Sequence, residues 1–392
     1  IFFWVARMIT MGEEFMGKEP FKHVFIHGLV RDEQGRKMSK SLGNGIDPVE
    51  VVDKYGADTL RFMLITGNTP GNDMRFYWNR IESTRNFANK IWNASRFALM
   101  NLDGYDKDAE KAPLTLADKW ILSRLQHTIR DVSNYMEKFE LGEAGRLIYD
   151  FIWGEVCDWY IELAKPRLYD RENAAARATA QTVLCRVLGD AMKLLHPYMP
   201  FITEEIWQHL PHEGQSIMIA PWPVADDNLM DDTVEKQMTA VMDVIKAIRN
   251  MRAEVNAAPG HKAPATVLVD EDLKAVFAAN GDYIRQLGTV DTLTLGGMED
   301  TAPENAMAAV VNGAKVYLPL KGLIDVEKEL ARLQKELDGA EKEAKRTAGK
   351  LNNQNFLAKA PAEVVEKEKT KQTEILARID GLKERIATLR SL

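Results

Sequence analysis

The chain has 392 residues, 45% hydrophobic and 28% charged, a composition typical of a globular protein of about two to four domains. No run of about 18 uninterrupted apolar residues is present, so contact with a membrane is not expected. Cys157 and Cys185 stand far apart without a CxxC pair, which argues against structural zinc and disulfides and predicts a cytoplasmic location. The net charge of −7 argues against a uniformly basic protein, but the segment after residue 325 is slightly basic.

Residues 1–71 predict the last part of a Rossmann-like α/β domain. Residues 1–16 predict a helix rather than a signal peptide, because no basic segment or cleavage site frames the apolar run. The start in mid-pattern, without Met, indicates a truncated chain. Residues 21–28 are rich in β-forming side chains and predict a strand that leads into a loop over residues 29–41. Helices are expected to begin at Asp47, as N-cap before a proline, and at residues 55–58.

Residues 72–260 predict a helical domain, because apolar residues recur there at helical spacing. The expected helices pass through residues 81–97, 116–136, 141–165, 174–195, 200–209 and 233–255. Four aromatic residues in this region are interpreted as core, since aromatic side chains at helical spacing in a bundle are usually buried. These are Trp153, Trp159, Tyr160 and Trp207.

Two smaller parts are expected after the helical domain. Residues 261–320 predict a small α/β module, with strands at 264–269, 292–295 and 314–320 and a helix at 273–287. Residues 321–392 predict an antiparallel coiled coil, with a first arm about 39 Å long at about 1.5 Å per residue. Two apolar seams at steps of three and four, separated by a break at 352–361, carry this prediction. The seams are Leu323, Val326, Leu330, Leu333, Leu337, Ala340, Ala344, Thr347 and Leu351, then Ile375, Ile379, Leu382, Ile386 and Leu389.

The segment Lys37-Met38-Ser39-Lys40-Ser41, followed by Leu42-Gly43-Asn44, carries the clearest chemistry. Two lysines supply mobile positive charge, two serines supply hydroxyl groups, and Gly43 allows a tight turn, so the loop is suited to close over a polyphosphate. The plainer interpretation is a solvated basic turn. The predicted strand before the loop and the helix start after it favour the functional interpretation.

The pentapeptide is identical to the second signature of class I aminoacyl-tRNA synthetases. Over essentially all of its length the chain resembles the valyl-tRNA synthetase family. The stretches that carry the resemblance are IFFWVARM at 1–8, HGLVRD at 27–32, KMSKS at 37–41, YGAD at 55–58, NFANK at 86–90, APWP at 220–223 and FLAKAP at 356–361. The first motifs are shared with isoleucyl and leucyl relatives. The terminal hairpin, without a cysteine-bearing zinc module, favours the valyl member.

The resemblance implies ATP-dependent activation of valine to valyl-adenylate and transfer to the 2′-hydroxyl of the terminal adenosine of valine tRNA. It implies that Lys40 is the main contact to ATP and Lys37 its helper, with Mg²⁺ accompanying the ATP. The remaining ATP-binding residues that it implies are Ser39, Ser41, His27 and Gly28. A structural histidine at the end of the strand is the alternative for His27. The helix at residues 1–8 resembles one side of the valine pocket, although for Phe2 and Trp4 a core role is favoured.

The resemblance also implies two contacts to tRNA and a monomeric protein. Phe97 would stack on an anticodon base and Arg96 would lie beside it; the alternative is that Phe97 continues the apolar stripe of its helix. The coiled coil would rest on the outer corner of the tRNA, whereas an ordinary salt-bridged coiled coil is the alternative. Its basic residues are Arg332, Lys335, Lys342, Lys345, Arg346 and Lys350.

The first half of the nucleotide-binding domain and the editing domain are expected upstream, because the seven histidines form no class I histidine signature. A valine pocket rejects the near-isosteric threonine poorly by binding alone, so editing is needed. The chain on its own is therefore expected to be inactive. An isoleucyl or leucyl ligase and a non-catalytic tRNA-binding module remain alternatives.

Overall fold

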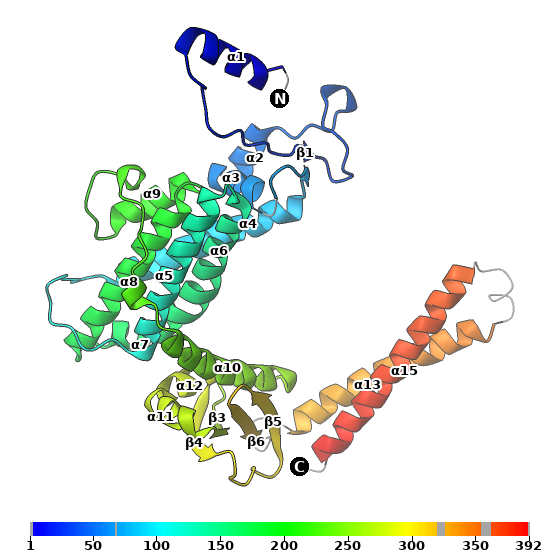
Figure 1. Cartoon of the computed structure of the whole chain (residues 1–392). Coiled ribbons are helices and arrows are strands. Elements are labelled where there is room, and N and C mark those ends of the chain that lie inside the picture. The colour runs from blue at the N-terminus through cyan, green and yellow to red at the C-terminus, as the bar shows by residue number, and fades with distance from the viewer. Residues whose placement is uncertain (1–2, 67–68, 320–325, 354–361, 391–392) are drawn as a thin grey trace. The chain divides into compact units, whose positions relative to one another are not determined.

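The computed structural model describes residues 3–66, 69–319, 326–353 and 362–390 (Figure 1). The chain divides into two compact units, Ile1–Glu235 and Lys236–Leu392. Helices dominate the described residues of both units, and a four-stranded sheet lies in the second. No described helix is long and apolar enough to cross a membrane.

The first unit begins with α1 (Val5–Met16), which buries none of its side chains. Trp4, just before it, is 69% exposed, so the described residues do not form the core expected around it. Phe2 lies outside the described residues. The predicted strand at 21–28 is wrong, because the segment is irregular and no described strand pairs with it. The chain instead forms β1 (Val30–Arg31), which pairs in parallel with β2 (Met74–Arg75).

Two short helices follow the predicted loop, as expected. Asp47 caps α2 (Pro48–Tyr55) by accepting a hydrogen bond from the Val49 amide, and Gly56 separates α2 from α3 (Ala57–Ile65). These helices pack on the strands through one apolar cluster. Its buried members are Val51, Tyr55, Met63, Met74, Phe76 and Ile81.

The helical bundle comprises α4 to α9. These are α4 (Trp78–Asn101), α5 (Leu116–Glu137), α6 (Leu141–Asp150), α7 (Ile161–Tyr169), α8 (Ala174–Leu195) and α9 (Pro200–His209). The single helix predicted at 141–165 is present as α6, a π-helical segment (Phe151–Tyr160) and α7. Tyr160 and Trp207 are core residues, as predicted, whereas Trp153 and Trp159 are only half-buried. Burial raises the pKa of the free thiols of Cys157 and Cys185 to about 12.

Asp58 and Arg61, on α3, fasten this helix to the bundle. The Asp58 carboxylate accepts hydrogen bonds from the amides of Phe201 (3.2 Å) and Ile202 (2.7 Å), in the first turn of α9. The residue before α9, Met199, offers no side-chain cap, so Asp58 satisfies amides that would otherwise lack partners. The Arg61 guanidinium donates to the carbonyl oxygens of the adjoining corner, at residues 197 and 198.

The second unit contains most of α10 (Asp232–Glu254) and a mixed sheet of order β4-β3-β6-β5. The strands are β3 (Ala263–Val269), β4 (Val290–Gly297), β5 (Ala306–Val311) and β6 (Ala314–Pro319). β3 and β4 run parallel, and they are joined through α11 (Glu271–Ala279) and α12 (Gly281–Gly288). The edge strand β5 was not predicted, because its alanines are weak strand formers.

The chain ends in two packed helices, α13 (Val326–Leu351) and α15 (Ala362–Arg390). Their contact buries the described seam residues Leu333, Leu337, Ala340, Ala344, Ile375, Ile379 and Ile386. Glu341 pairs with Lys383 and Glu343 with Lys371, so the order of partners is reversed and the helices run antiparallel. The side chains of Leu323, Val326 and Leu389 lie outside the described residues.

A buried ion pair within the bundle gives a test of its stability. Asp118 is fully buried and accepts two hydrogen bonds of 2.7 Å from the Arg167 guanidinium. We expect Arg167→Met to lower the free energy of unfolding by about 3–5 kcal/mol, because it leaves a buried carboxylate without its counter-charge. Denaturant unfolding followed by circular dichroism measures this change.

Arg146→Met is the matched control, because Arg146 forms exposed pairs with Glu143 and Asp150. Its expected cost is at most about 1 kcal/mol. Equal effects of the two substitutions would contradict the assignment of Asp118 and Arg167 as a stabilising pair.

Candidate nucleotide and tRNA sites

The loop that carries the pentapeptide at residues 37–41, called the signature loop below, follows a tight turn after β1. Three hydrogen bonds join Asp32 and Arg36. The Asp32 amide donates to the Arg36 carbonyl (3.1 Å), and the Arg36 amide and guanidinium each donate to the Asp32 carboxylate (both 2.7 Å). Gly35 adopts a φ of 80°, which a residue with a side chain rarely takes. The turn therefore returns the chain beside β1, where Lys37 forms an antiparallel bridge with Arg31.

Asn44 joins the two ends of the signature loop. Its side-chain amide donates to the Asp32 carboxylate (2.9 Å) and to the Lys37 carbonyl (3.3 Å), and its side-chain oxygen accepts from the Ser39 amide (3.0 Å). Burial alone would raise the pKa of Asp32. The hydrogen bonds from Asn44 and Arg36 outweigh it and lower this pKa from 3.8 to about 2. The base of the loop is thus an ionised carboxylate held by several donors.

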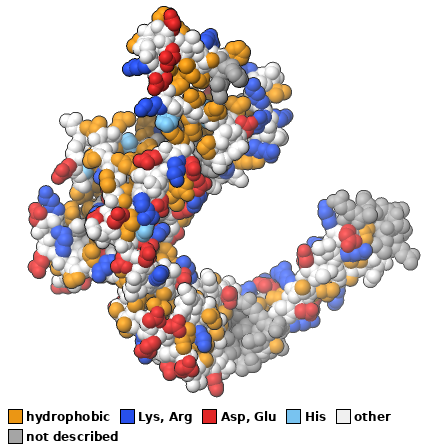
Figure 2. All heavy atoms as spheres, viewed as in Figure 1, with side chains coloured by type: hydrophobic (Ala, Val, Ile, Leu, Met, Phe, Trp, Pro, Cys, Tyr) orange, Lys and Arg blue, Asp and Glu red, His pale blue; other side chains and the backbone are white. Residues whose placement is uncertain are grey.

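The loop presents its lysines to solvent. Ser39 caps a short 3₁₀ turn (Lys40–Leu42) by accepting from the Leu42 amide, and its hydroxyl lies 3.2 Å from that of Ser41. Lys37 and Lys40 are exposed, and neither forms an ion pair with a carboxylate in the described part of the chain. Figure 2 shows Lys and Arg side chains grouped on the face that carries this segment. Two mobile cations on a fixed base are suited to binding phosphate groups.

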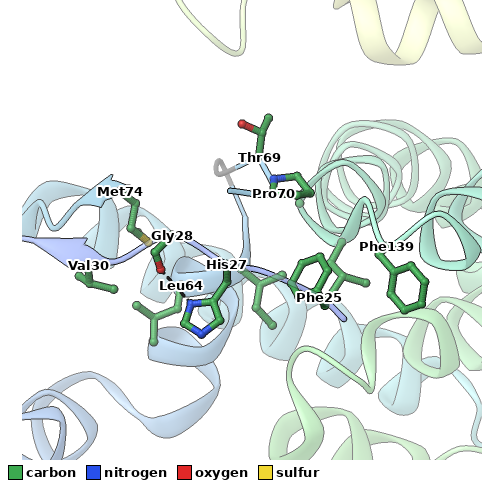
Figure 3. Close-up of a pocket in the computed structure, with 12 residues that line it drawn as sticks. Phe25, His27, Gly28, Val30, Leu64, Thr69, Pro70, Met74 and Phe139 are labelled. Carbon is green, nitrogen blue, oxygen red and sulfur yellow. Dashed lines mark hydrogen bonds between the residues drawn. The ribbon is translucent and has the colours of Figure 1, made fainter. Parts of the chain in front are cut away.

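His27 and Gly28 line a largely apolar cavity of about 340 Å³. The His27 ring turns back to the carbonyl of Gly28, with its Nδ1 2.8 Å from that oxygen (Figure 3). The rings of Phe25 and Phe139 lie 6.0 Å apart at one end of the cavity. A Cβ atom at position 28 would lie 1.7 Å from the backbone oxygen of Asn72, so packing alone requires this glycine.

Phe97 lies on α4 against α7. It is half-buried, with its ring edge-on to Tyr169 at a centroid distance of 6.2 Å. The Lys165 ammonium lies 5.4 Å from the ring centroid and also pairs with Glu162. Arg96 is exposed beside this group. An aromatic ring flanked by cations at the surface is an arrangement that can stack on a nucleic-acid base.

The cations of the α13–α15 pair whose side chains the structure describes are exposed or half-buried. Arg332 pairs with Glu336 and Lys350 with Glu368, whereas four others on α13 form no ion pair with the described carboxylates. These are Lys335, Lys342, Lys345 and Arg346. In the described residues, no group of three or more His, Cys, Asp or Glu side chains is placed to hold a metal ion.

Sequence reasoning missed the residues that support these sites. Asp32 and Asn44 hold the loop. Asp32 ends the HGLVRD stretch and Asn44 follows the pentapeptide closely, so their position beside the lysines was the available signal. Lys165 and Tyr169 stand four residues apart on one helix but far along the chain from Phe97. Only the fold reveals their contact with its ring.

Three family models match different parts of the chain. "tRNA synthetases class I (I, L, M and V)" matches residues 1–77, and "Anticodon-binding domain of tRNA ligase" matches residues 118–268. "Valyl tRNA synthetase tRNA binding arm" matches residues 325–390. The chain therefore belongs to the class I aminoacyl-tRNA synthetases.

Three curated relatives that match nearly the whole chain are all valine–tRNA ligases. The valine–tRNA ligase of Carboxydothermus hydrogenoformans is 54% identical over 391 residues, which cover 99% of this chain. Those of Geobacillus stearothermophilus and Bacillus subtilis (strain 168) are 52% and 49% identical over 100% of it. The chain belongs to the valine–tRNA ligase family, and it spans 44% of the length of each of these relatives.

Solved structures are less similar. The LeuRS–tRNA–LeuAMS ternary complex of Agrobacterium radiobacter K84 is 25% identical, with a TM-score of 0.45, and covers 57% of this chain and 27% of that one. A Mycobacterium tuberculosis methionyl-tRNA synthetase with methionyl-adenylate is 25% identical, with a TM-score of 0.41, and covers 46% and 36%. Neither similarity is high enough to assign a function.

Asn44→Ala tests the construction of the loop. Without the Asn44 amide, we expect the pKa of Asp32 to rise from about 2 toward 3.8. Because the folded-state pKa lies below the unfolded value, the interaction stabilises the loop above about pH 4 and is lost as the pH falls toward 2. Titration of the Asp32 carboxyl carbon by NMR measures this pKa.

Ser41→Ala is the control, since the Ser41 hydroxyl contacts Ser39 and not Asp32. We expect it to leave the pKa of Asp32 unchanged. An unaltered pKa in Asn44→Ala would show that Asn44 does not set the charge at the base of the loop.

Proposed function

We propose that this chain forms the part of a valine–tRNA ligase that closes over ATP and binds valine tRNA. The observation that carries the proposal is the pair of exposed lysines, Lys37 and Lys40, on a loop whose base is fixed by Asn44 and Asp32. The identity of about half of all residues to valine–tRNA ligases supports valine as the amino acid.

The first chemical step explains why such a loop is needed. When the valine carboxylate attacks the α-phosphate of ATP, negative charge develops on the phosphates as pyrophosphate leaves. Donors placed where that charge appears stabilise the transition state. We assign Lys40 as the main donor and Lys37 as its helper, with Ser39 and Ser41 shaping the loop. Mg²⁺ would enter with ATP as part of the substrate.

The adenosine of ATP is assigned to the backbone near His27 and Gly28, where the chain runs extended into β1. The glycine keeps this backbone free of a side chain, although its contact with Asn72 already requires it. His27 is exposed and can reorient from its contact with the Gly28 carbonyl.

The nucleotide-binding half of the site needs more protein than the described residues supply. β1 and β2 form a two-stranded parallel sheet, and parallel sheets are stable when both faces are covered. Large apolar side chains such as Phe3, Trp4 and Phe15 remain more than two-thirds exposed on and before α1. We propose that the additional sequence of the longer relatives covers this surface and completes the ATP and valine sites.

Activity of the chain tests this assignment. We expect no valine-dependent ATP–pyrophosphate exchange from the 392-residue chain alone. We expect exchange when the chain replaces the matching region of the Carboxydothermus hydrogenoformans enzyme. In that chimera, Lys40→Ala should lower the exchange rate by about 10²–10³, because one transition-state donor is lost.

Lys119→Ala, at an exposed lysine of α5, is the matched control and should leave the exchange rate unchanged. Exchange by the isolated chain would refute the need for further sequence. A chimera that activates isoleucine or leucine instead of valine would favour the corresponding ligases.

We propose four functional parts with the boundaries given by the sequence. Residues 1–71 end the catalytic domain, 72–260 bind the anticodon, 261–320 form a small α/β module, and 321–392 form a coiled-coil arm that binds tRNA. The antiparallel packing of α13 and α15 supports the last assignment. The half-buried ring of Phe97, with Lys165 and Tyr169 against it, supports the assignment of residues 72–260 to anticodon binding.

Binding to tRNA tests the anticodon assignment. We expect the chain to prefer valine tRNA over the same tRNA with its anticodon exchanged, and to keep this preference when the salt concentration is raised. Phe97→Leu should remove about 1–3 kcal/mol of the preference, because base stacking on the ring is lost. Fluorescence anisotropy at two salt concentrations measures both affinities.

Phe201→Leu is the matched control, since Phe201 is 66% exposed on a different helix. It should leave the preference intact. Equal binding to both tRNAs that disappears with salt would mean phosphate contact alone and would refute the role of Phe97. If tRNA binds specifically while the chimera shows no exchange, the non-catalytic tRNA-binding module is favoured.

A further inference from the structure

The two helices at the end of the chain use their cations differently. On α15, three lysines are held in ion pairs: Lys369 with Glu366, Lys371 with Glu343 and Lys383 with Glu341. On α13, four exposed cations have no such partner among the described residues: Lys335, Lys342, Lys345 and Arg346. Among the described residues, most of the exposed cations without an ion pair therefore lie on α13, and Arg378 of α15 is a further one.

Three of these cations share one line along α13. Lys342 and Arg346 follow Lys335 by seven and eleven residues, so all three point within about 20° of one direction at 3.6 residues per turn. The buried residues Leu337 and Ala344 point to the opposite side, into the contact with α15. Lys335 and Lys342 thus face away from α15, whereas Arg346 lies close enough to Glu343 and to Glu368 of α15 to lower the pKa of both carboxylates. Figure 2 shows blue side chains along the exposed edges of this helix pair.

Two glycines lie on the same face of α13. Gly339 and Gly349 are exposed, and a Cβ atom at either position would meet no atom within 4 Å. Packing within the described chain therefore does not require them. Glycine inside a helix is less stable than alanine, but it permits a ligand backbone to approach closely.

We propose that this face of α13, rather than α15, lies against the ribose–phosphate backbone of the bound tRNA. The face consists of Lys335, Gly339, Lys342, Arg346 and Gly349. The three cations contact phosphates, and the two glycines let the RNA backbone approach the helix. The inference rests on the proposed function of this helix pair as a tRNA-binding arm, and it assigns the face that binds.

The composition of the face favours phosphate over base contacts. Of its five residues, none carries an aromatic or apolar side chain on which a base could stack. Lysine and arginine supply donors for phosphate oxygens without reading sequence. The face therefore contributes salt-dependent affinity, and base recognition resides elsewhere.

Neutralising the face tests its contacts. In the 392-residue chain, we expect the combination Lys335→Gln, Lys342→Gln and Arg346→Gln to weaken binding of valine tRNA at least tenfold at about 0.1 M salt. The slope of log affinity against log salt should fall by about two to three, because each lost phosphate contact removes about 0.7–0.9. The combination Lys369→Gln, Arg378→Gln and Lys383→Gln removes the same charge from α15 and should change affinity less than about threefold.

Replacing the glycines gives an independent readout. Gly339→Ala with Gly349→Ala should raise the thermal midpoint of the helix pair, because alanine favours helix, and yet weaken tRNA binding at least about fivefold. If the glycines had only a structural role, the substitutions would raise the thermal midpoint without weakening tRNA binding. Circular dichroism melting and fluorescence anisotropy on the same samples measure the two effects.

The outcomes separate this inference from the proposed function. If the unaltered chain binds valine tRNA but the α13 and α15 combinations weaken this binding equally, the assignment of the face is wrong. The proposed function of the helix pair as a tRNA-binding arm would then still stand. If the alanine variants bind tRNA as well as the unaltered chain, close approach at the glycines is refuted. If the unaltered chain binds no tRNA, both the arm and its face are refuted.

Discussion

The contact between α3 and the start of α9 holds the first unit together. Asp58 supplies the cap that α9 lacks, and Arg61 binds the carbonyls of the corner before it. The segment that follows the signature loop is thereby joined to the helical bundle within one compact unit. A carboxylate at the N-terminus of a helix also meets the favourable end of the helix dipole. The signature loop and the bundle that carries Phe97 thus belong to one framework.

Local patterns predicted the helices well. The bundle helices were placed because their apolar spacing is regular, and Asp47 was identified as a cap from its own sequence context. The strand at residues 21–28 was predicted from β-forming side chains, but a strand also needs a hydrogen-bonded neighbour, and no described strand provides one. Trp4 was assigned to a core that the described residues do not form. Both predictions depend on neighbouring segments, and a local sequence pattern does not show which segments these are.

In the candidate site too, residues that are adjacent in the sequence were predicted, whereas contacts between distant residues were not. The lysines and serines of the loop were found from the motif, because their chemistry lies in adjacent residues. The support from Asp32 and Asn44 depends on a turn that brings residues twelve positions apart into contact. The contacts of Phe97 with Lys165 and Tyr169 join different helices, so no local pattern contains them. The direction in which the α13 cations point required knowledge of which side packs on α15.

The two cysteines of the bundle have a practical consequence. A thiol with a pKa of about 12 is ionised in only about one molecule in 10⁵ at pH 7, and the thiolate is the form that alkylating reagents attack. Cys157 and Cys185 should therefore stay unlabelled under mild maleimide treatment of the folded chain. A cysteine introduced at an exposed position would then be modified selectively. Fluorophores or spin labels can be attached at chosen sites without first removing the native thiols.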